Sequence, residues 1–196
     1  MNDLFIKIIR KKLSYQYKKN MNAPDSWENN GVNTSLDDFH FYVDEAILFS
    51  TKLQTVANIP NGRFLDTIAP GPFQLKCFVE NRSFHGRIHG IINTFDMDGQ
   101  RINENSIETV IGKNGAPISL TRWIMHDDQK LLPNPPNEIT RVAWSAGCYV
   151  HHITNLEAFN NILDAYKIMP GDIINGELIE EDNPIWSDVG AHINNN

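Results

Sequence analysis

The stretch Trp144-Ser145-Ala146-Gly147-Cys148 carries the strongest chemical signal in the sequence. A cysteine that acts as a nucleophile needs access, a base that holds it as the thiolate, and donors for the oxyanion that it generates. Ala146 and Gly147 are small, so a substrate carbonyl can approach Cys148 closely. Gly147 also allows a tight turn that would aim the amides of Gly147 and Cys148 at one point, as an oxyanion hole requires. We therefore predict that Cys148 is a catalytic nucleophile.

His126 is the predicted base for this thiol. It ends the apolar, strand-like run Trp123-Ile124-Met125 and is followed by Asp127 and Asp128. A histidine at the end of a strand is well placed to project into a cleft. The alternative is a structural histidine bonded to one of the two aspartates.

The centre of the chain has the pattern of short strands separated by turns. Apolar and polar residues alternate there, and Gly- and Asn-rich turns divide the runs. The segment Leu131–Asn137 contains three prolines and is expected to be an irregular loop. The expected strands are Phe39–Val43, Ile47–Leu53 (where a helix over Asp44–Thr51 also fits), Phe73–Val79, Gly86–Phe95 and Ile118–Met125.

One helix and one hairpin are predicted after the cysteine. Thr154 and Glu157 form a capping box, and Met169-Pro170-Gly171 ends the helix. The positive end of this helix would lower the thiol pKa if it lay near Cys148. Asn175-Gly176 between apolar pairs predicts a tight hairpin within Ile173–Ile179. The apolar face of the helix consists of Leu156, Phe159, Ile162, Leu163 and Tyr166.

The N-terminal segment is expected to be a separate arm. Residues 1–20 fit a short helix with Leu4, Ile8, Ile9 and Leu13 on one face, which would dock on the protein's own core, on a partner or on a membrane surface. The order of charge and apolarity is not that of a secretory signal. The expected division is an arm and linker over 1–36, a catalytic domain over 37–182 and a polar tail over 183–196.

The composition excludes some classes of protein. A net charge of −7 argues against a nucleic-acid binder, because no basic field is available to displace phosphate counterions. Two cysteines, Cys77 and Cys148, do not make the dense framework of a small disulfide scaffold. Cys77 lies inside a predicted strand and is expected to be inert. No motif implies a cofactor.

Three segments, in order, resemble the L,D-transpeptidase (YkuD-type) catalytic domain. They are Thr67-Ile68-Ala69-Pro70-Gly71-Pro72-Phe73-Gln74-Leu75, Trp123-Ile124-Met125-His126 and Ser145-Ala146-Gly147-Cys148. The capped helix and the Pro170-Gly171-Asp172-Ile173-Ile174 strand follow as in that family, over roughly residues 60 to 180. Asp127 directly after the histidine and Val150 two places after the cysteine depart from the family pattern and indicate a divergent branch.

The resemblance implies a mainly β fold with a few helices (α+β), a sandwich or barrel with a helix after the nucleophile. It also implies a cysteine enzyme that exchanges or cuts the stem peptides of peptidoglycan through a thioester. Such an enzyme would be periplasmic or associated with the cell wall. The catalytic residues would be Cys148, His126, Gly147 and Ser145, and the substrate-binding residues Trp144, His89, His151 and Asp127.

Two other functions remain open from the sequence. His85, His89, His151 and His152 could form the site of a zinc-dependent hydrolase, although no zinc motif is matched. The chain could also be an inactive module of the same fold that binds the wall or a partner.

Overall fold

The structure is a computed structural model, and it describes most of the strands and the helix after the cysteine. Strands dominate, and α2 is the one helix among the described residues, in agreement with the predicted fold class. The described residues are 2–10, 36–55, 67–82, 86–97, 99–111, 117–121, 123–128, 145 and 147–181.

Strands β1 to β5 occupy the first half of the chain, and the remaining elements follow from residue 94 onward. The elements are β1 Leu4–Arg10, β2 Asp37–Val43, β3 Ala46–Gln54, β4 Gly71–Arg82, β5 Gly86–Ile92, β6 Thr94–Phe95, β7 Arg101–Ile102, β8 Ile107–Ile111, β9 Pro117–Thr121, β10 Ile124–Asp127, β11 Tyr149–His151, α2 Ile153–Ala165 and β12 Ile173–Glu180.

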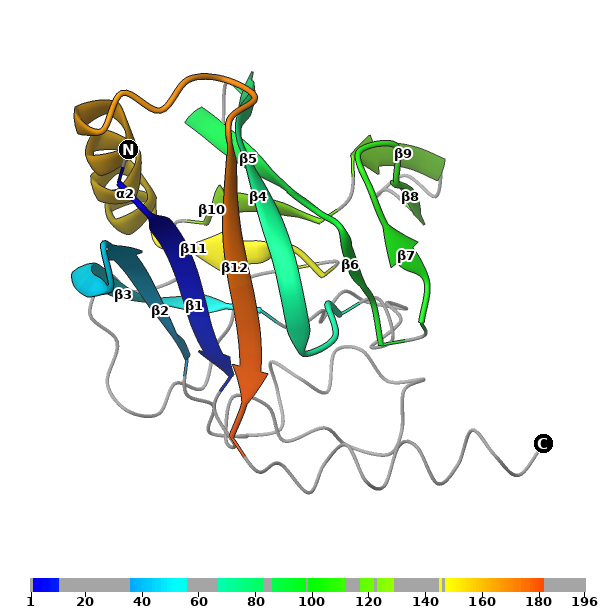
Figure 1. The fold of residues 1–196 in the computed structure, drawn as a ribbon. Coiled ribbons are helices and arrows are strands. Elements are labelled where there is room, and N and C mark those ends of the chain that lie inside the picture. The colour runs from blue at the N-terminus through cyan, green and yellow to red at the C-terminus, as the bar shows by residue number, and fades with distance from the viewer. Residues whose placement is uncertain are drawn as a thin grey trace.

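Eight of these strands form a closed barrel in the order β1-β12-β4-β5-β10-β11-β3-β2 (Figure 1). The pairs β1/β12 and β10/β11 are parallel, and the other neighbours in the barrel are antiparallel. The short pairs β6/β7 and β8/β9 lie beside the barrel. A closed barrel leaves no sheet edge, so every barrel strand has two hydrogen-bonded neighbours.

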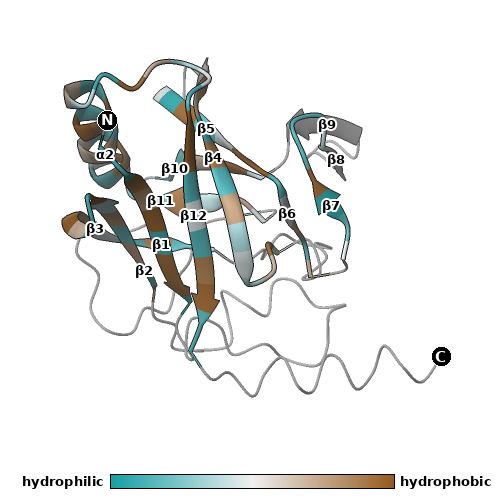
Figure 2. Cartoon of the chain, in the orientation of Figure 1, coloured by the Kyte–Doolittle hydropathy of each residue, from teal (hydrophilic) through white to brown (hydrophobic). Residues whose placement is uncertain are grey.

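The core fills the barrel because side chains alternate between its two faces. In β1, for example, Ile6 and Ile8 are fully buried, whereas their neighbours are only partly buried. Figure 2 shows the resulting mixture of hydrophobic and hydrophilic residues along the barrel strands. Helix α2 covers one end, where the Phe159 ring packs on Phe39 and Phe41 at centroid distances of 5.1 and 5.4 Å.

The expected N-terminal helix is wrong. Residues Leu4–Arg10 form β1, which pairs with β12 on one side and β2 on the other, so they belong to the barrel and not to a separate arm. The apolar residues of this segment fit both a period of two, as in a strand, and helical spacing. Pairing with two neighbouring strands favours the strand. The rest of the proposed arm, residues 11–35, lies outside the described residues.

The expected hairpin at Asn175-Gly176 is also wrong. β12 runs straight through both residues. Gly176 is required for packing: a Cβ there would lie 2.5 Å from Cζ of Phe73. The glycine that predicted a turn therefore allows the close approach of two strands instead.

Two smaller expectations change. The predicted strand Ile118–Met125 is divided between β9 and β10, and Trp123 has a φ of 55° at the break. Helix α2 is capped by His152, whose ring Nδ1 accepts from the amide of Thr154, and not by Thr154 itself. The helix among the described residues is not long and apolar enough to cross a membrane.

Candidate active site

Parallel strands β10 and β11 bring the predicted base next to the predicted nucleophile. His126 pairs with Val150, and Cys148 comes directly before β11. Met125 and Tyr149 form the adjacent pair and lie in the core, so alternation directs His126 to the outer face. Cys148, one residue before β11, is partly exposed and lies diagonally from His126 across the strand pair, where neighbours are on the order of 7–8 Å apart.

The orientation of His126 is fixed by a backbone group. Its Nδ1 lies 2.8 Å from the carbonyl oxygen of Asp127. A carbonyl oxygen can only accept, so Nδ1–H donates and the acceptor lone pair of the neutral ring is on Nε2. A general base that accepts a proton on Nε2 would need this tautomer, with the main-chain oxygen as the group that orients the ring.

The turn before Cys148 is held by Ser145. The Ser145 hydroxyl accepts from the amide of Gly147 and donates to the carbonyl of Cys148, at 3.2 Å in both cases. Gly147 has a φ of 108°, in a region that other residues avoid. The Gly147 amide therefore braces the turn in this structure, and does not point its hydrogen at an oxyanion as the sequence suggested.

The two cysteines lie in different environments. Cys148 is partly exposed, whereas Cys77 is fully buried in β4 and belongs to the core. Burial, with a smaller contribution from Asp172, raises the pKa of Cys77 to about 12, so this thiol is not a nucleophile at neutral pH. Cys77 is an internal reference for the reactivity of Cys148.

The positive end of helix α2 is not directly beside Cys148 along the chain. The helix begins at Ile153, and the three residues of β11 and His152 lie between it and Cys148. The field of a helix end falls off within the first turn, so the structure gives no support to the condition that this end lies near the thiol.

His89 is a buried structural residue and not a substrate contact. Its Nδ1 accepts from the amide of Phe78 at 3.2 Å, and its Nε2–H donates to Oδ1 of Asn160 at 2.8 Å. Phe78 has a φ of 49° at the place where the β4/β5 register shifts. The His89 ring therefore accepts a hydrogen bond from an amide that has no partner in the strand pairing. Burial lowers the pKa of His89 to about 4. Asn160, a polar residue on the buried stripe of α2, was the available signal in the sequence.

His151 and Asp127 are also buried, which argues against the predicted contact with a substrate. They pair across β10 and β11 and face the interior. The His151 ring packs on Phe39 at 5.0 Å, and neither of its nitrogens has a hydrogen-bond partner of normal geometry in the described part of the chain. Burial, with smaller contributions from nearby histidines, lowers the pKa of His151 to about 3.

The described histidines of the predicted zinc site, His89, His151 and His152, do not assemble into a metal site. His152 caps α2 at the surface, while His89 is occupied by protein partners on both nitrogens. Within the described ranges, no three His, Cys, Asp or Glu side chains are grouped to hold a metal ion. His85, Trp144 and Ala146 lie outside the described residues.

A buried polar cluster inside the barrel was not predicted. Arg10 Nε donates to the Thr55 hydroxyl at 2.8 Å, and this hydroxyl donates to Asp37 at 2.6 Å. The carboxylate of Glu180 lies 3.6 Å from the Arg10 guanidinium. The Tyr149 hydroxyl is buried as well, and burial raises its pKa. Five separate segments supply this cluster, so no local pattern could indicate it.

Comparison with known proteins identifies a relative. A protein of Treponema pallidum (strain Nichols), described as uncharacterized, is 35% identical over 190 residues, which cover 91% of this chain and 81% of that protein. This chain belongs to the same protein family. No family model matches it.

A comparison of this chain with solved structures found a weaker similarity. The structure titled "Structure of the Ldtfm-avibactam carbamoyl enzyme" is that of an L,D-transpeptidase; it is 12% identical, with a TM-score of 0.41. The alignment covers 92% of this chain, which spans half the length of the other. Overlap at this level carries no argument about activity.

Proposed function

We propose that this protein is a cysteine acyl-transfer enzyme of the L,D-transpeptidase kind, acting on the stem peptides of peptidoglycan. The observation that carries the proposal is the register of β10 and β11, which makes His126 and Cys148 diagonal neighbours. The motifs that resemble the L,D-transpeptidases supply the substrate class.

The first half of the reaction forms a thioester. Nε2 of His126 takes the thiol proton of Cys148, and the thiolate attacks a peptide carbonyl carbon. The tetrahedral intermediate then collapses: the C–N bond breaks, and the amine leaves with the proton that His126 held. The Nδ1–H bond to the Asp127 carbonyl supports the imidazolium between these two transfers.

The second half releases the acyl group. His126 takes a proton from an incoming amine or water, which attacks the thioester and returns the thiol to Cys148 with that proton. An amine gives a new peptide bond, and water gives a shortened peptide. The bonds of Ser145 keep the turn, and therefore the thiol, in one position throughout.

A covalent probe tests the nucleophile directly. We expect a carbapenem to add its mass once to the intact protein, because its strained ring opens on attack by an activated thiolate. Cys148→Ala should abolish the adduct, whereas Cys77→Ala should retain it, since the Cys77 thiol is buried and protonated. His126→Ala should slow the adduct by at least about a hundredfold, the usual contribution of a positioned base. An adduct that survives in Cys148→Ala, or its absence in the folded wild type, refutes the proposal.

A stem tetrapeptide decides between the two outcomes of the second half. Incubation with and without a free amine, followed by mass analysis, separates the exchanged peptide from the shortened one. Both products depend on Cys148 if the proposal is right. Turnover that persists in Cys148→Ala contradicts it.

A further inference from the structure

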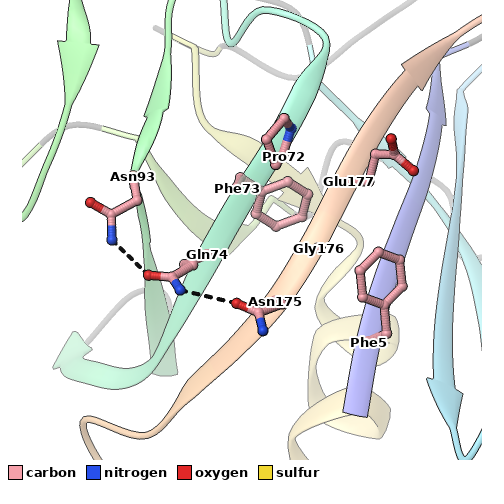
Figure 3. Close-up of a pocket in the computed structure, with 8 residues that line it drawn as sticks. All are labelled: Phe5, Pro72, Phe73, Gln74, Asn93, Asn175, Gly176 and Glu177. Carbon is pink, nitrogen blue, oxygen red and sulfur yellow. Dashed lines mark hydrogen bonds between the residues drawn. The ribbon is translucent and has the colours of Figure 1, made fainter. Parts of the chain in front are cut away.

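A groove on the outer face of the barrel lies away from Cys148. It has a volume of about 460 Å³ and spans strands β5, β4, β12 and β1 (Figure 3). Its polar wall consists of three side-chain amides, those of Asn93, Gln74 and Asn175, and Phe5 stands across β12 from them.

The strand register places these four residues in one transverse row. Gln74 pairs with Ile92 on one side and with Asn175 on the other, and Asn175 pairs with Phe5. Asn93 follows Ile92 with a φ of 55°, a conformation that asparagine tolerates, and its side chain reaches Gln74. Three strand spacings make this row about 14 Å long.

The amides form a directed chain. Nδ2 of Asn93 donates to Oε1 of Gln74 at 2.6 Å, and Nε2 of Gln74 donates to Oδ1 of Asn175 at 3.0 Å. Each amide has two N–H donors and an acceptor with two lone pairs, so the chain leaves hydrogens on all three nitrogens and lone pairs on all three oxygens. These groups face solvent at fixed positions.

Stability alone does not account for this chain. An exposed amide–amide bond replaces bonds to water and contributes little, while ordering a glutamine side chain costs entropy. An ordered, exposed row of donors and acceptors suits the recognition of a ligand that carries hydroxyl and amide groups.

The charge and shape of the groove narrow the class of ligand. Glu177 is the charged residue among the described residues that line it, and none of these offers a basic side chain to a phosphate or a carboxylate. Phe5 presents an aromatic side chain at the end of the row, and Pro72 adds a second apolar surface. An apolar ring beside a row of amides matches a sugar, which has an apolar C–H face and a rim of hydroxyl groups.

We propose that this groove binds a neutral oligosaccharide. The row is long enough for a short chain of sugar rings laid across the strands. Two strand steps along the barrel wall, from β5 through β10 to β11, separate the groove's nearest strand from β11, which follows Cys148. If the proposed function also holds, the groove would take the glycan strand while the thiol acts on the attached peptide; the sugar site itself does not depend on that function.

The experiment is a titration of the full chain with a neutral N-acetylglucosamine tetramer, followed by the side-chain NH₂ signals in ¹⁵N spectra. We expect the signals of Asn93, Gln74 and Asn175 to shift with a saturable curve at millimolar sugar. Asn175→Asp keeps the shape but removes two donors, and should weaken binding about tenfold. Phe5→Leu should weaken it by a similar factor.

Matched controls separate the groove from the rest of the molecule. Asn161→Asp makes the same change at an exposed position of α2 and should bind like the wild type. Cys148→Ala should also bind unchanged, so a failed thiol chemistry and a failed sugar site are distinguishable. The proposal is overturned if the three amide signals do not move, if Asn175→Asp binds as tightly as the wild type, or if a neutral peptide shifts these signals and the sugar does not.

Discussion

Lowering the pH from about 7 to about 5 is expected to remove about 4 kcal/mol from the free energy of unfolding through two buried histidines. His89 and His151 are fully buried, and burial lowers their pKa values to about 4 and about 3. Both rings therefore stay neutral in the folded protein across this range, while the unfolded chain, with a histidine pKa of about 6.5, takes up protons.

The sign and size follow from this difference. Stability that depends on the neutral rings is complete above about pH 6.5 and is lost as the pH falls toward the folded pKa values. At pH 5 each histidine favours the unfolded state by about 2 kcal/mol relative to pH 7. The sum is a large part of the 5–15 kcal/mol, roughly, that stabilises an ordinary domain.

His151→Leu isolates one of the two contributions. Leucine is apolar and removes both ring nitrogens that have no hydrogen-bond partner of normal geometry in the described structure. Urea unfolding at the two pH values should show a loss in this variant that is about 2 kcal/mol smaller than in the wild type. His40→Gln, which changes a histidine exposed beside Ser50, serves as the control and should keep the loss seen in the wild type. An equal loss in His151→Leu and the wild type would show that the ring is not held neutral and would refute the reasoning.

Three further substitutions test the site and the barrel. Ser145→Ala removes two long hydrogen bonds from the turn and should slow carbapenem acylation about fivefold to tenfold without changing the fold, measured by stopped-flow absorbance. Gly176→Ala should destabilise the protein by about 2 kcal/mol or more, because the new methyl group meets the Phe73 ring; Phe73→Leu in the same chain should recover part of this loss in thermal unfolding. Arg10→Met leaves the Asp37 carboxylate buried without its cationic neighbour and should cost about 3–5 kcal/mol in urea unfolding, and a loss below about 1 kcal/mol would contradict the assigned network.

The features whose pattern lies within one segment could be predicted from the sequence. The strand Phe73–Val79, which lies within β4, was expected from its alternation, and the helix that begins near Thr154 from its apolar spacing, because both signals lie within one segment. The pairing of His126 with Cys148 was predicted from the place of the histidine at the end of a strand-like run, and the resemblance between motifs implied the same pair. The hydrogen bond from His126 to the Asp127 carbonyl has no sequence signal, since every residue carries such an oxygen.

Other assignments failed because one pattern permits two structures. Leu4–Arg10 fits a helix and a strand, and only pairing with β2 and β12 decides between them. Asn175-Gly176 fits a hairpin, but the glycine makes room for the ring of Phe73 from a strand about a hundred residues earlier. His89 and His151 were predicted as site residues because the sequence does not show that they are buried. Burial depends on how the whole barrel packs.

The sequence by itself determined that this chain is mainly β and singled out Cys148 and His126, because alternation and motif spacing are written along the chain. Only the tertiary structure decided which face each side chain occupies. It put His126 on the outer face, sent His89, His151 and Asp127 inward, and lined up Asn93, which follows β5, with residues of β4, β12 and β1 in a groove. The physical reason is register: a shift of one residue in strand pairing exchanges the two faces, and closure of the barrel fixes that register through contacts between segments far apart in sequence.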